Sequence, residues 1–592
     1  MITLDIPKQD YTILLEKNVS VPMRDGTVLR ADVFRPDVEG QFPVIIERTM
    51  LWKGEGGFNQ CHQTGNHLAP RGYVYIAQDV RGAYESEGEF TFAEDDGWGN
   101  HQDGFDTIEW AAQQPWCNGN VGMVGACNSG MTQSLIAPTR PPHLKALFII
   151  IGGAHRNYFF RDNVYRLSTQ RGVAFWYQLH QLQYPTASPE KEAVRSYLEK
   201  ASQDPNEMAT WFRHLPLKSF PPADNWQNWF FKVLDHPEND PYWSMTDVSL
   251  KFNEIDVPIV HLTGWFDLAL KFSLNYFSGI QKNGWSEPCR RAQRLIVGPW
   301  GHLNIGERQI GEIDFGSEAV IDVESLRLKW FEYWLKGINN GFIDEPCVRV
   351  FLMGENRWVD LETWPPAEAR YEPMYFREGH ERSSTSLRNG GLTFEIPGNA
   401  EKADSFVYDP ENPIPSLASD IDALPMDYRS LEERMLTYTS DVLNKPLTII
   451  GPVKTILLGQ SSTKDTDWVV RLCDVWPDGR SISVCDGVMR ARYRNSLDHE
   501  ELLEPGMTYR IEVDMWATAQ TFQPGHRIRV QVTSSDFPRY DRNLNTGGTF
   551  GEESCGQTAT NTIFHDALRP SHILLPVIPW QSGTMKCRIN SR

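Results

Sequence analysis

The residue best suited to covalent chemistry is Cys127, within the stretch Gly119–Gly130 (GNVGMVGACNSG). The small apolar residues at 121–125 predict a buried strand, and 131–135 predict the start of a helix. Cys127 would lie on the sharp turn between them, a nucleophile elbow, with the amide of Asn128 directed at a developing oxyanion. A helix N-terminus favours the thiolate. The alternative is that Cys127 is a small buried hydrophobic residue, as most free cysteines are.

A nucleophile of this kind needs a base and a group that orients the base. A predicted strand at 257–262 leads to Asp267, and another at 294–297 leads to His302. Because the carboxyl ends of parallel strands meet at one edge of a sheet, we expect both residues beside Cys127. Taken singly, Asp267 fits a helix N-cap and His302 an ordinary loop histidine. Their order after the elbow favours an acid and a base.

The first half of the chain alternates apolar runs with stretches of helical spacing at 106–112 and 323–335. Continuous apolar runs suit central parallel strands that are covered on both faces. The pattern predicts an α/β fold with a doubly wound sheet, formed by residues 1–152 and 252–345. The apolar runs lie at 42–48, 73–79, 121–125, 144–151, 257–262 and 294–297.

Two changes of texture predict further units. Residues 153–251 hold helix-like segments, and an insertion at this point would form a helical cap over the strand ends. From 346 to 592, short β segments such as 468–472 and 481–484 are separated by Gly, Pro and Asp turns, which is typical of a sandwich or jelly roll. The cap is rich in tryptophan, with Trp176, Trp211, Trp226, Trp229 and Trp243.

Composition narrows the class of protein. A formal charge of -20 over 592 residues disfavours nucleic acid and anionic membrane surfaces as partners. We find neither a signal-peptide pattern nor 18 consecutive apolar residues, so no membrane partner is expected. Nine cysteines without CxxC spacing favour a reduced, cytoplasmic protein. We expect a small-molecule substrate, and the sequence is compatible with a homodimer.

No pattern in the sequence indicates a cofactor or a metal. Cys61-His62 with His67 has no matching second cluster, and the acidic loop at 95–99 has glycine where a calcium loop needs side-chain oxygens. No Gly-rich phosphate or dinucleotide fingerprint follows a strand. We therefore expect a chain that works without a cofactor.

Several motifs resemble those of the cocaine esterase family, which includes α-amino acid ester hydrolases, glutaryl acylases and X-Pro dipeptidyl-peptidases. The resemblance covers nearly the whole chain. It implies an α/β-hydrolase domain interrupted by a helical cap and followed by a C-terminal jelly roll, with a serine triad and no cofactor. The family's nucleophile, acid and base fall on Cys127, Asp267 and His302. The motifs are Lys17–Val19, Val21–Gly26, Asp79–Gly82, Ser86–Phe90, Gln114–Met123, Gly298–His302 and Pro524–Val530.

The chain departs from the family pattern at two positions. Cys127 stands where the family has serine. Leu51 stands where the motif Arg-x-Pro-Tyr carries a tyrosine whose hydroxyl assists the oxyanion hole, and losing one such donor typically costs ~10²–10³ in rate. Trp52 either replaces that donor with its indole N–H or packs against the cap. Trp176 and Trp265 are expected to line the substrate site.

The sequence predicts an acyl-transfer enzyme with a Cys-His-Asp triad that acts on an ester, thioester or amide. A thioester intermediate keeps more reactivity toward amines and thiols than an oxygen ester, so transfer to a second substrate is as plausible as hydrolysis. The tryptophan-rich cap favours an apolar or aromatic acyl group. Two alternatives stay open: a serine esterase with an engineered Ser→Cys nucleophile, and a repurposed hydrolase fold for non-covalent catalysis or ligand binding.

Overall fold

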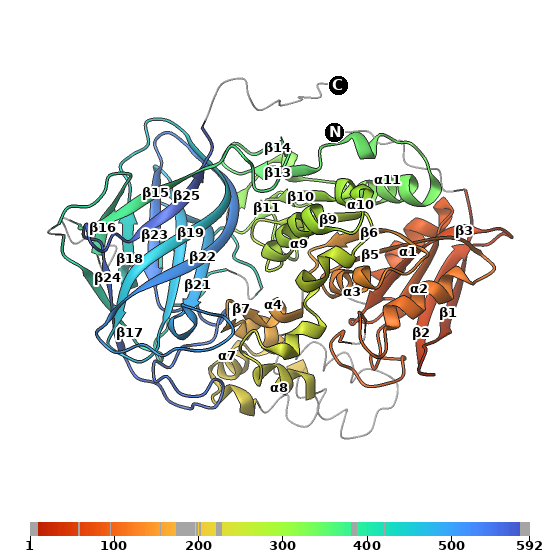
Figure 1. The fold of residues 1–592 in the computed structure, drawn as a ribbon, viewed down its shortest axis with the longest axis horizontal. Coiled ribbons are helices and arrows are strands. Elements are labelled where there is room, and N and C mark those ends of the chain that lie inside the picture. The colour runs from red at the N-terminus through yellow and green to blue at the C-terminus, as the bar shows by residue number, and fades with distance from the viewer. Residues whose placement is uncertain are drawn as a thin grey trace.

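The computed structural model describes residues 10–579, apart from 57–59, 95, 154, 173–195, 197–198, 201–202, 221–227, 380–387, 400 and 419–420. Two large sheets organise this part of the chain. Figure 1 shows the sheet of the first half on the right and the sheet of the C-terminal half on the left. Short helices lie between them at the lower edge: α4 (His155–Phe159), α7 (Pro205–Arg213) and α8 (Asn228–Leu234).

The first sheet has ten described strands in the order β1-β2-β4-β3-β5-β6-β9-β10-β13-β14. Pairing is parallel from β4 to β13 and antiparallel at both edges. The six runs read as central strands are all confirmed as strands. The bounds are β1 (Ile13–Pro22), β2 (Val28–Pro36), β3 (Phe42–Thr49), β4 (Val74–Asp79), β5 (Cys117–Ala126), β6 (Leu144–Ile150), β9 (Ile259–Gly264), β10 (Arg294–Gly298), β13 (Val348–Leu352) and β14 (Arg357–Leu361).

Helices cover both faces of this sheet, as the continuous apolar strands require. Successive strand residues pack into different hydrophobic cores: Val124 belongs to the core that includes α1 and α11, and Met123 to the core that includes α2 and α3. The doubly wound α/β fold is therefore confirmed. The bounds are α1 (Cys61–Leu68), α2 (Asp103–Ala112), α3 (Asn128–Ile136), α9 (Leu270–Asn283), α10 (Glu287–Ala292) and α11 (Val323–Lys336).

The segment between β6 and β9 is mostly helical where it is described. It adds the short hairpin β7 (Phe160–Arg161) and β8 (Val164–Tyr165), and the 3-10 helices η5 (Pro241–Met245) and η6 (Val248–Glu254). Trp211, Trp229 and Trp243 are at most 7% exposed and belong to a hydrophobic core. These tryptophans pack the segment internally, so they do not support the expected preference for an apolar acyl group. The limits 153–251 and 346–592 stay a prediction.

The C-terminal half forms an all-β unit whose described strands follow the order β17-β24-β19-β25-β15-β16-β18-β23-β20-β21, with β22 paired to β19. A turn at 477–479 joins β20 to β21, and the expectation of a β-rich C-terminal unit is confirmed. The bounds are β15 (Arg370–Arg377), β16 (Arg388–Thr393), β17 (Asp404–Tyr408), β18 (Leu436–Thr439), β19 (Leu447–Ser461), β20 (Asp467–Val475), β21 (Ser481–Arg490), β22 (Thr508–Phe522), β23 (Arg527–Thr533), β24 (Ala559–Phe564) and β25 (His572–Val577).

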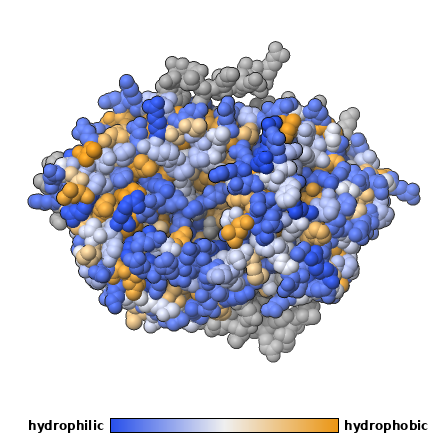
Figure 2. Space-filling model, in the orientation of Figure 1, coloured by the Kyte–Doolittle hydropathy of each residue, from blue (hydrophilic) through white to orange (hydrophobic). Residues whose placement is uncertain are grey.

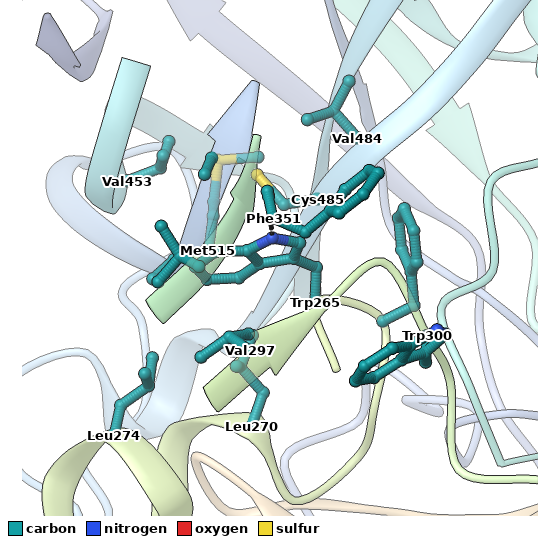
Figure 3. Packing of buried hydrophobic residues seen from close by; sticks show 14 of the residues in the cluster. Trp265, Leu270, Leu274, Val297, Trp300, Phe351, Val453, Val484, Cys485 and Met515 are labelled. Carbon is teal, nitrogen blue, oxygen red and sulfur yellow. Dashed lines mark hydrogen bonds between the residues drawn. The ribbon is translucent and has the colours of Figure 1, made fainter. Parts of the chain in front are cut away.

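The two halves share a continuous hydrophobic core. Figure 3 shows Trp265, from a loop of the first sheet, beside Cys485 of β21 and Met515 of β22, with Trp300 of a neighbouring loop farther from them in the same core. Hydrophilic residues dominate the face of the molecule drawn in Figure 2. Within residues 10–579 as described, we find no helix with the length and apolar character that crossing a membrane requires.

Candidate active site

Cys127 lies on a sharp turn between β5 and α3. Its backbone has φ 56° and ψ -119°, a positive φ that non-glycine residues rarely adopt. Gly125 has φ 146°, and a Cβ atom there would lie 2.3 Å from the Cβ of Ser129, so the turn requires glycine. The strand, turn and helix expected around Cys127 are confirmed. The chemistry of the thiol stays a prediction at this point.

Asp267 and His302 follow two adjacent parallel strands. Gly264 at the end of β9 lies opposite Gly298 at the end of β10, so both loops leave the sheet at the same edge. Backbone hydrogen bonds of 2.9 and 3.0 Å join the two loops. Nδ1 of His302 lies 2.7 Å from Oδ2 of Asp267, and both side chains are buried. The carboxylate can therefore fix the orientation of the imidazole.

His302 also interacts with the thiol of Cys127. Burial opposes charge on both groups, but each stabilises the charged form of the other. The pKa of the Cys127 thiol is lowered from its ordinary value, and the pKa of His302 is raised well above its own, with Asp267 adding to the rise. This arrangement favours a thiolate-imidazolium pair.

Tyr158 also acts on the thiol. It lies in α4, it is 5% exposed, and its hydroxyl helps to lower the thiol pKa of Cys127. The same hydroxyl lies 3.4 Å from the carbonyl oxygen of Ile151. Sequence reasoning missed Tyr158, because no motif or spacing marks it. The only available signal was its position shortly after the end of β6, which is next to β5 in the sheet.

The loop after β3 meets the elbow from the opposite side. The backbone N–H of Asn128 helps to lower the pKa of the Cys127 thiol, and its side-chain Oδ1 accepts the N–H of Met50 at 3.1 Å. The N–H of Leu51 donates to Oγ1 of Thr49 at 2.9 Å, and the Leu51 side chain packs against the hydrophobic core. Both of these main-chain donors are therefore already used inside the protein, and Leu51 brings no hydroxyl.

Lys53 anchors the end of the same loop. It is 1% exposed, and its N–H and Nζ donate to Asp79 at 2.8 and 3.0 Å, while Nζ also contacts Glu85. Burial would lower the pKa of Lys53, but the neighbouring carboxylates raise it; burial raises the pKa of Asp79 to about 7. Within the same motif, Arg81 binds Asp103 at 2.6 Å. The motif at 79–82 thus holds the loop in place.

The tryptophans expected at the site have different positions. Trp265 is 4% exposed, and its indole N–H donates to the carbonyl oxygen of Phe351 at 2.7 Å in the core between the two halves (Figure 3). The expectation that Trp265 lines the substrate site stays a prediction. Trp52 has φ 64°, and its indole lies over Gly54 in its own loop. Trp176 lies outside the described residues.

The cysteine and histidine cluster weighed as a metal site is used differently. Nε2 of His62 lies 2.9 Å from Oδ2 of Asp32, and Cys61 is buried beside Tyr75. Across the part of the chain that the structure describes, no three or more His, Cys, Asp or Glu side chains are grouped to hold a metal ion.

Comparisons with known proteins assign the family. The family model described as X-Pro dipeptidyl-peptidase (S15 family) matches residues 25–304, and the X-Pro dipeptidyl-peptidase C-terminal non-catalytic domain matches residues 340–574. The cocaine esterase of Rhodococcus sp. (strain MB1 Bresler) is 36% identical over 590 residues, covering 96% of this chain and 99% of that protein. The chain belongs to the cocaine esterase and X-Pro dipeptidyl-peptidase family. Relatives in this family that carry a function in their names are hydrolases.

Solved structures agree on the fold. An α-amino acid ester hydrolase matches with a TM-score of 0.73 and 23% identity, over 97% of this chain and 99% of that one. An aminopeptidase from a Thaumarchaeota archaeon of marine sediment matches with a TM-score of 0.76 and 23% identity, over 98% and 99%. The chain therefore has the α/β-hydrolase fold of its family, followed by a β-rich C-terminal domain.

Proposed function

We propose that this member of the family is a cysteine-dependent acyl-transfer enzyme, in which Cys127 takes the place of the family's serine nucleophile. The observation that carries the proposal is a cysteine on an elbow turn whose thiol pKa is lowered by His302, which is itself hydrogen-bonded to Asp267. A thiol that is merely buried has a raised pKa, as Cys61 has, whereas the pKa of Cys127 is lowered. That contrast supports a reactive thiolate.

In the first half-reaction, the thiolate of Cys127 attacks the carbonyl carbon of the acyl donor and the carbonyl oxygen takes up the negative charge. We assign the N–H of Asn128, the residue after the nucleophile, as a main-chain donor to that oxygen. As the tetrahedral intermediate collapses, the bond to the leaving group breaks, and the imidazolium of His302 gives its proton to the departing oxygen, sulfur or nitrogen. An acyl thioester on Cys127 and a neutral His302 remain.

In the second half-reaction, an acceptor with a removable proton attacks the thioester carbonyl. Neutral His302 takes that proton while Asp267 stabilises the resulting imidazolium. Cys127 then leaves as a thiolate, and the thiolate-imidazolium pair is restored. Water as the acceptor gives hydrolysis, whereas an amine, alcohol or thiol gives transfer. A thioester reacts with amines and thiols more readily than an oxygen ester does, which supports both outcomes.

The cocaine esterase relative supports an ester as the acyl donor, since it is 36% identical and matches almost end to end. The replacement of the oxyanion tyrosine by Leu51 favours donors with good leaving groups, because fewer donors then stabilise the developing oxyanion. We propose activated esters and thioesters as the first donors to examine.

The test is intact-protein mass spectrometry after incubation with aryl esters, acyl thioesters and cocaine. Three forms are compared: the chain as it stands, Cys127→Ala and Cys127→Ser. An adduct of acyl mass on the Cys127 peptide, which disappears when an amine, alcohol or thiol is added, is the expected result. Undiminished turnover by Cys127→Ala would overturn the proposal.

One observation favours a second candidate, non-covalent catalysis. The main-chain N–H groups of Met50 and Leu51 donate hydrogen bonds within the protein. Non-covalent catalysis does not require free N–H donors for an oxyanion. Under this alternative, His302 acts as a base, so His302→Gln loses turnover and Cys127→Ala keeps it. Turnover only by Cys127→Ser would instead identify a serine esterase whose nucleophilic serine has been replaced by cysteine.

A further inference from the structure

A segment of the C-terminal domain crosses both loops that carry the acid and the base. Asp422 accepts the backbone N–H of His302 at its Oδ2, at a distance of 2.7 Å. The next residue, Ala423, donates its N–H to the carbonyl oxygen of Phe266, at 3.2 Å, and Phe266 directly precedes Asp267. Two consecutive residues from the far half of the chain therefore hold the main chain on both sides of the hydrogen bond between His302 and Asp267.

The contact depends on close approach. Asp422 is 2% exposed, and a Cβ atom on Gly301 would lie 2.4 Å from its Oδ2. Only glycine at 301 therefore leaves room for the carboxylate. Burial and the negative charge of Asp267 raise the pKa of Asp422 to about 7, opposed by the positive charges of His302 and Arg539. A second carboxyl group is thus electrostatically coupled to the acid and the base.

We propose that Asp422 is a positioning residue of the catalytic site, which fixes the main chain of His302 so that its imidazole bridges Cys127 and Asp267. The inference rests on the proposed function. It gives a catalytic task to a domain whose family model is described as non-catalytic. Asp422 acts through His302 and does not touch the reacting atoms.

The effect of each substitution depends on whether an acceptor for the backbone N–H of His302 is kept at position 422. Asp422→Ala removes the acceptor of the His302 N–H, so the loop can shift; a misplacement of 1 Å at a catalytic group can cost ~10²-fold in rate. Asp422→Asn keeps an oxygen that accepts the same N–H. Gly301→Ala leaves the carboxylate in the chain but displaces it, so this substitution should reproduce the effect of Asp422→Ala without touching the C-terminal domain.

Asp541 offers a matched control. It is a buried carboxylate of the same domain that also accepts a backbone N–H from the first half of the chain, that of Tyr165 at 3.1 Å. Asp541→Asn and Asp541→Ala therefore perturb a domain contact of the same kind. Neither should alter the reactivity of Cys127.

The experiment measures the rate of alkylation of Cys127 by iodoacetamide from pH 5 to 9, by peptide mass spectrometry, with melting curves to confirm folding. Asp422→Ala and Gly301→Ala should each slow alkylation roughly tenfold at pH 6, which is one unit in the apparent thiol pKa. Asp422→Asn and both Asp541 variants should stay within about twofold, well inside one pKa unit. Unaltered profiles for Asp422→Ala and Gly301→Ala would overturn the inference.

His302→Gln separates this inference from the proposed function. If His302→Gln slows alkylation at pH 6 and neither Asp422→Ala nor Gly301→Ala does, the thiolate-imidazolium pair stands and only the positioning role is refuted. If His302→Gln leaves the profile unchanged, the pair itself is refuted, and both proposals fail together.

Discussion

Replacing Tyr158 with phenylalanine removes one hydroxyl group beside the thiol and leaves the buried ring in place. That hydroxyl helps to lower the pKa of the Cys127 thiol and so favours the thiolate. A hydrogen bond to a charged group contributes about 1.5–3 kcal/mol, and one pKa unit corresponds to about 1.4 kcal/mol. Tyr158→Phe should therefore raise the thiol pKa by about one to two units.

The assay is again alkylation by iodoacetamide, followed at the Cys127 peptide because Cys555 is exposed and also reacts. At pH 6, where the rate follows the thiolate fraction, the variant should react ~10- to 100-fold more slowly. Near pH 9.5 the two proteins should approach the same rate. Melting temperatures should differ little, since the ring still fills its place.

Tyr165→Phe is the control. Tyr165 is 1% exposed, and its hydroxyl has no hydrogen-bond partner among the described residues. Removing that hydroxyl should leave the alkylation profile unchanged. An unchanged profile for Tyr158→Phe, in a protein where His302→Gln does move it, would refute the assignment of the tyrosine hydroxyl to the thiolate.

Three further predictions concern Gly125 in the elbow turn, the buried carboxyl group of Asp422, and Lys53, which anchors the loop after β3. Gly125→Ala should lower the free energy of unfolding by at least ~1–3 kcal/mol in urea titrations, because its Cβ would lie 2.3 Å from Ser129; equal stability would refute the tight turn. The pKa of Asp422 is raised to about 7 in the folded protein, so the stability that this carboxyl contributes is full below its ordinary pKa and is lost as the pH rises to 7. The stability of Asp422→Asn relative to the wild type should therefore increase from pH 4 to 7 by on the order of 4 kcal/mol and then level off. A difference that stays constant with pH would contradict this. Lys53→Met should cost ~3–5 kcal/mol in the same titrations, because it leaves the buried carboxylate of Asp79 without its cation, and a loss below 1 kcal/mol would show that the pair is not needed.

Much of the fold could be predicted from the sequence because central strands are marked by their own residues. Buried parallel strands need apolar side chains on both faces, so the six runs were visible without any knowledge of their neighbours. The predicted bounds of the strands were less accurate than their positions. The run at 257–262 becomes the strand Ile259–Gly264, since Pro258 has no N–H to give to a ladder and Gly264 continues the pairing with β10.

The candidate site was only partly predictable, and the reason is distance along the chain. Cys127, Asp267 and His302 each follow a strand, so local patterns find them. Tyr158 and Asp422 reach the site through tertiary packing, which leaves no mark on local spacing. Trp265 illustrates a related limit, because an aromatic residue after a strand end has the same appearance in sequence whether a ligand or another domain covers it.

The bond between Asp422 and His302 spans 120 positions of the chain, which orders events during synthesis. At roughly 5–20 residues per second, a ribosome needs about 6–24 s to add that length after His302. Over that interval the nascent first half contains Cys127, Asp267 and His302 but lacks the hydrogen bond from the His302 loop to Asp422. The histidine loop therefore gains this hydrogen bond only after Asp422 has been synthesised, well after Cys127, Asp267 and His302 themselves.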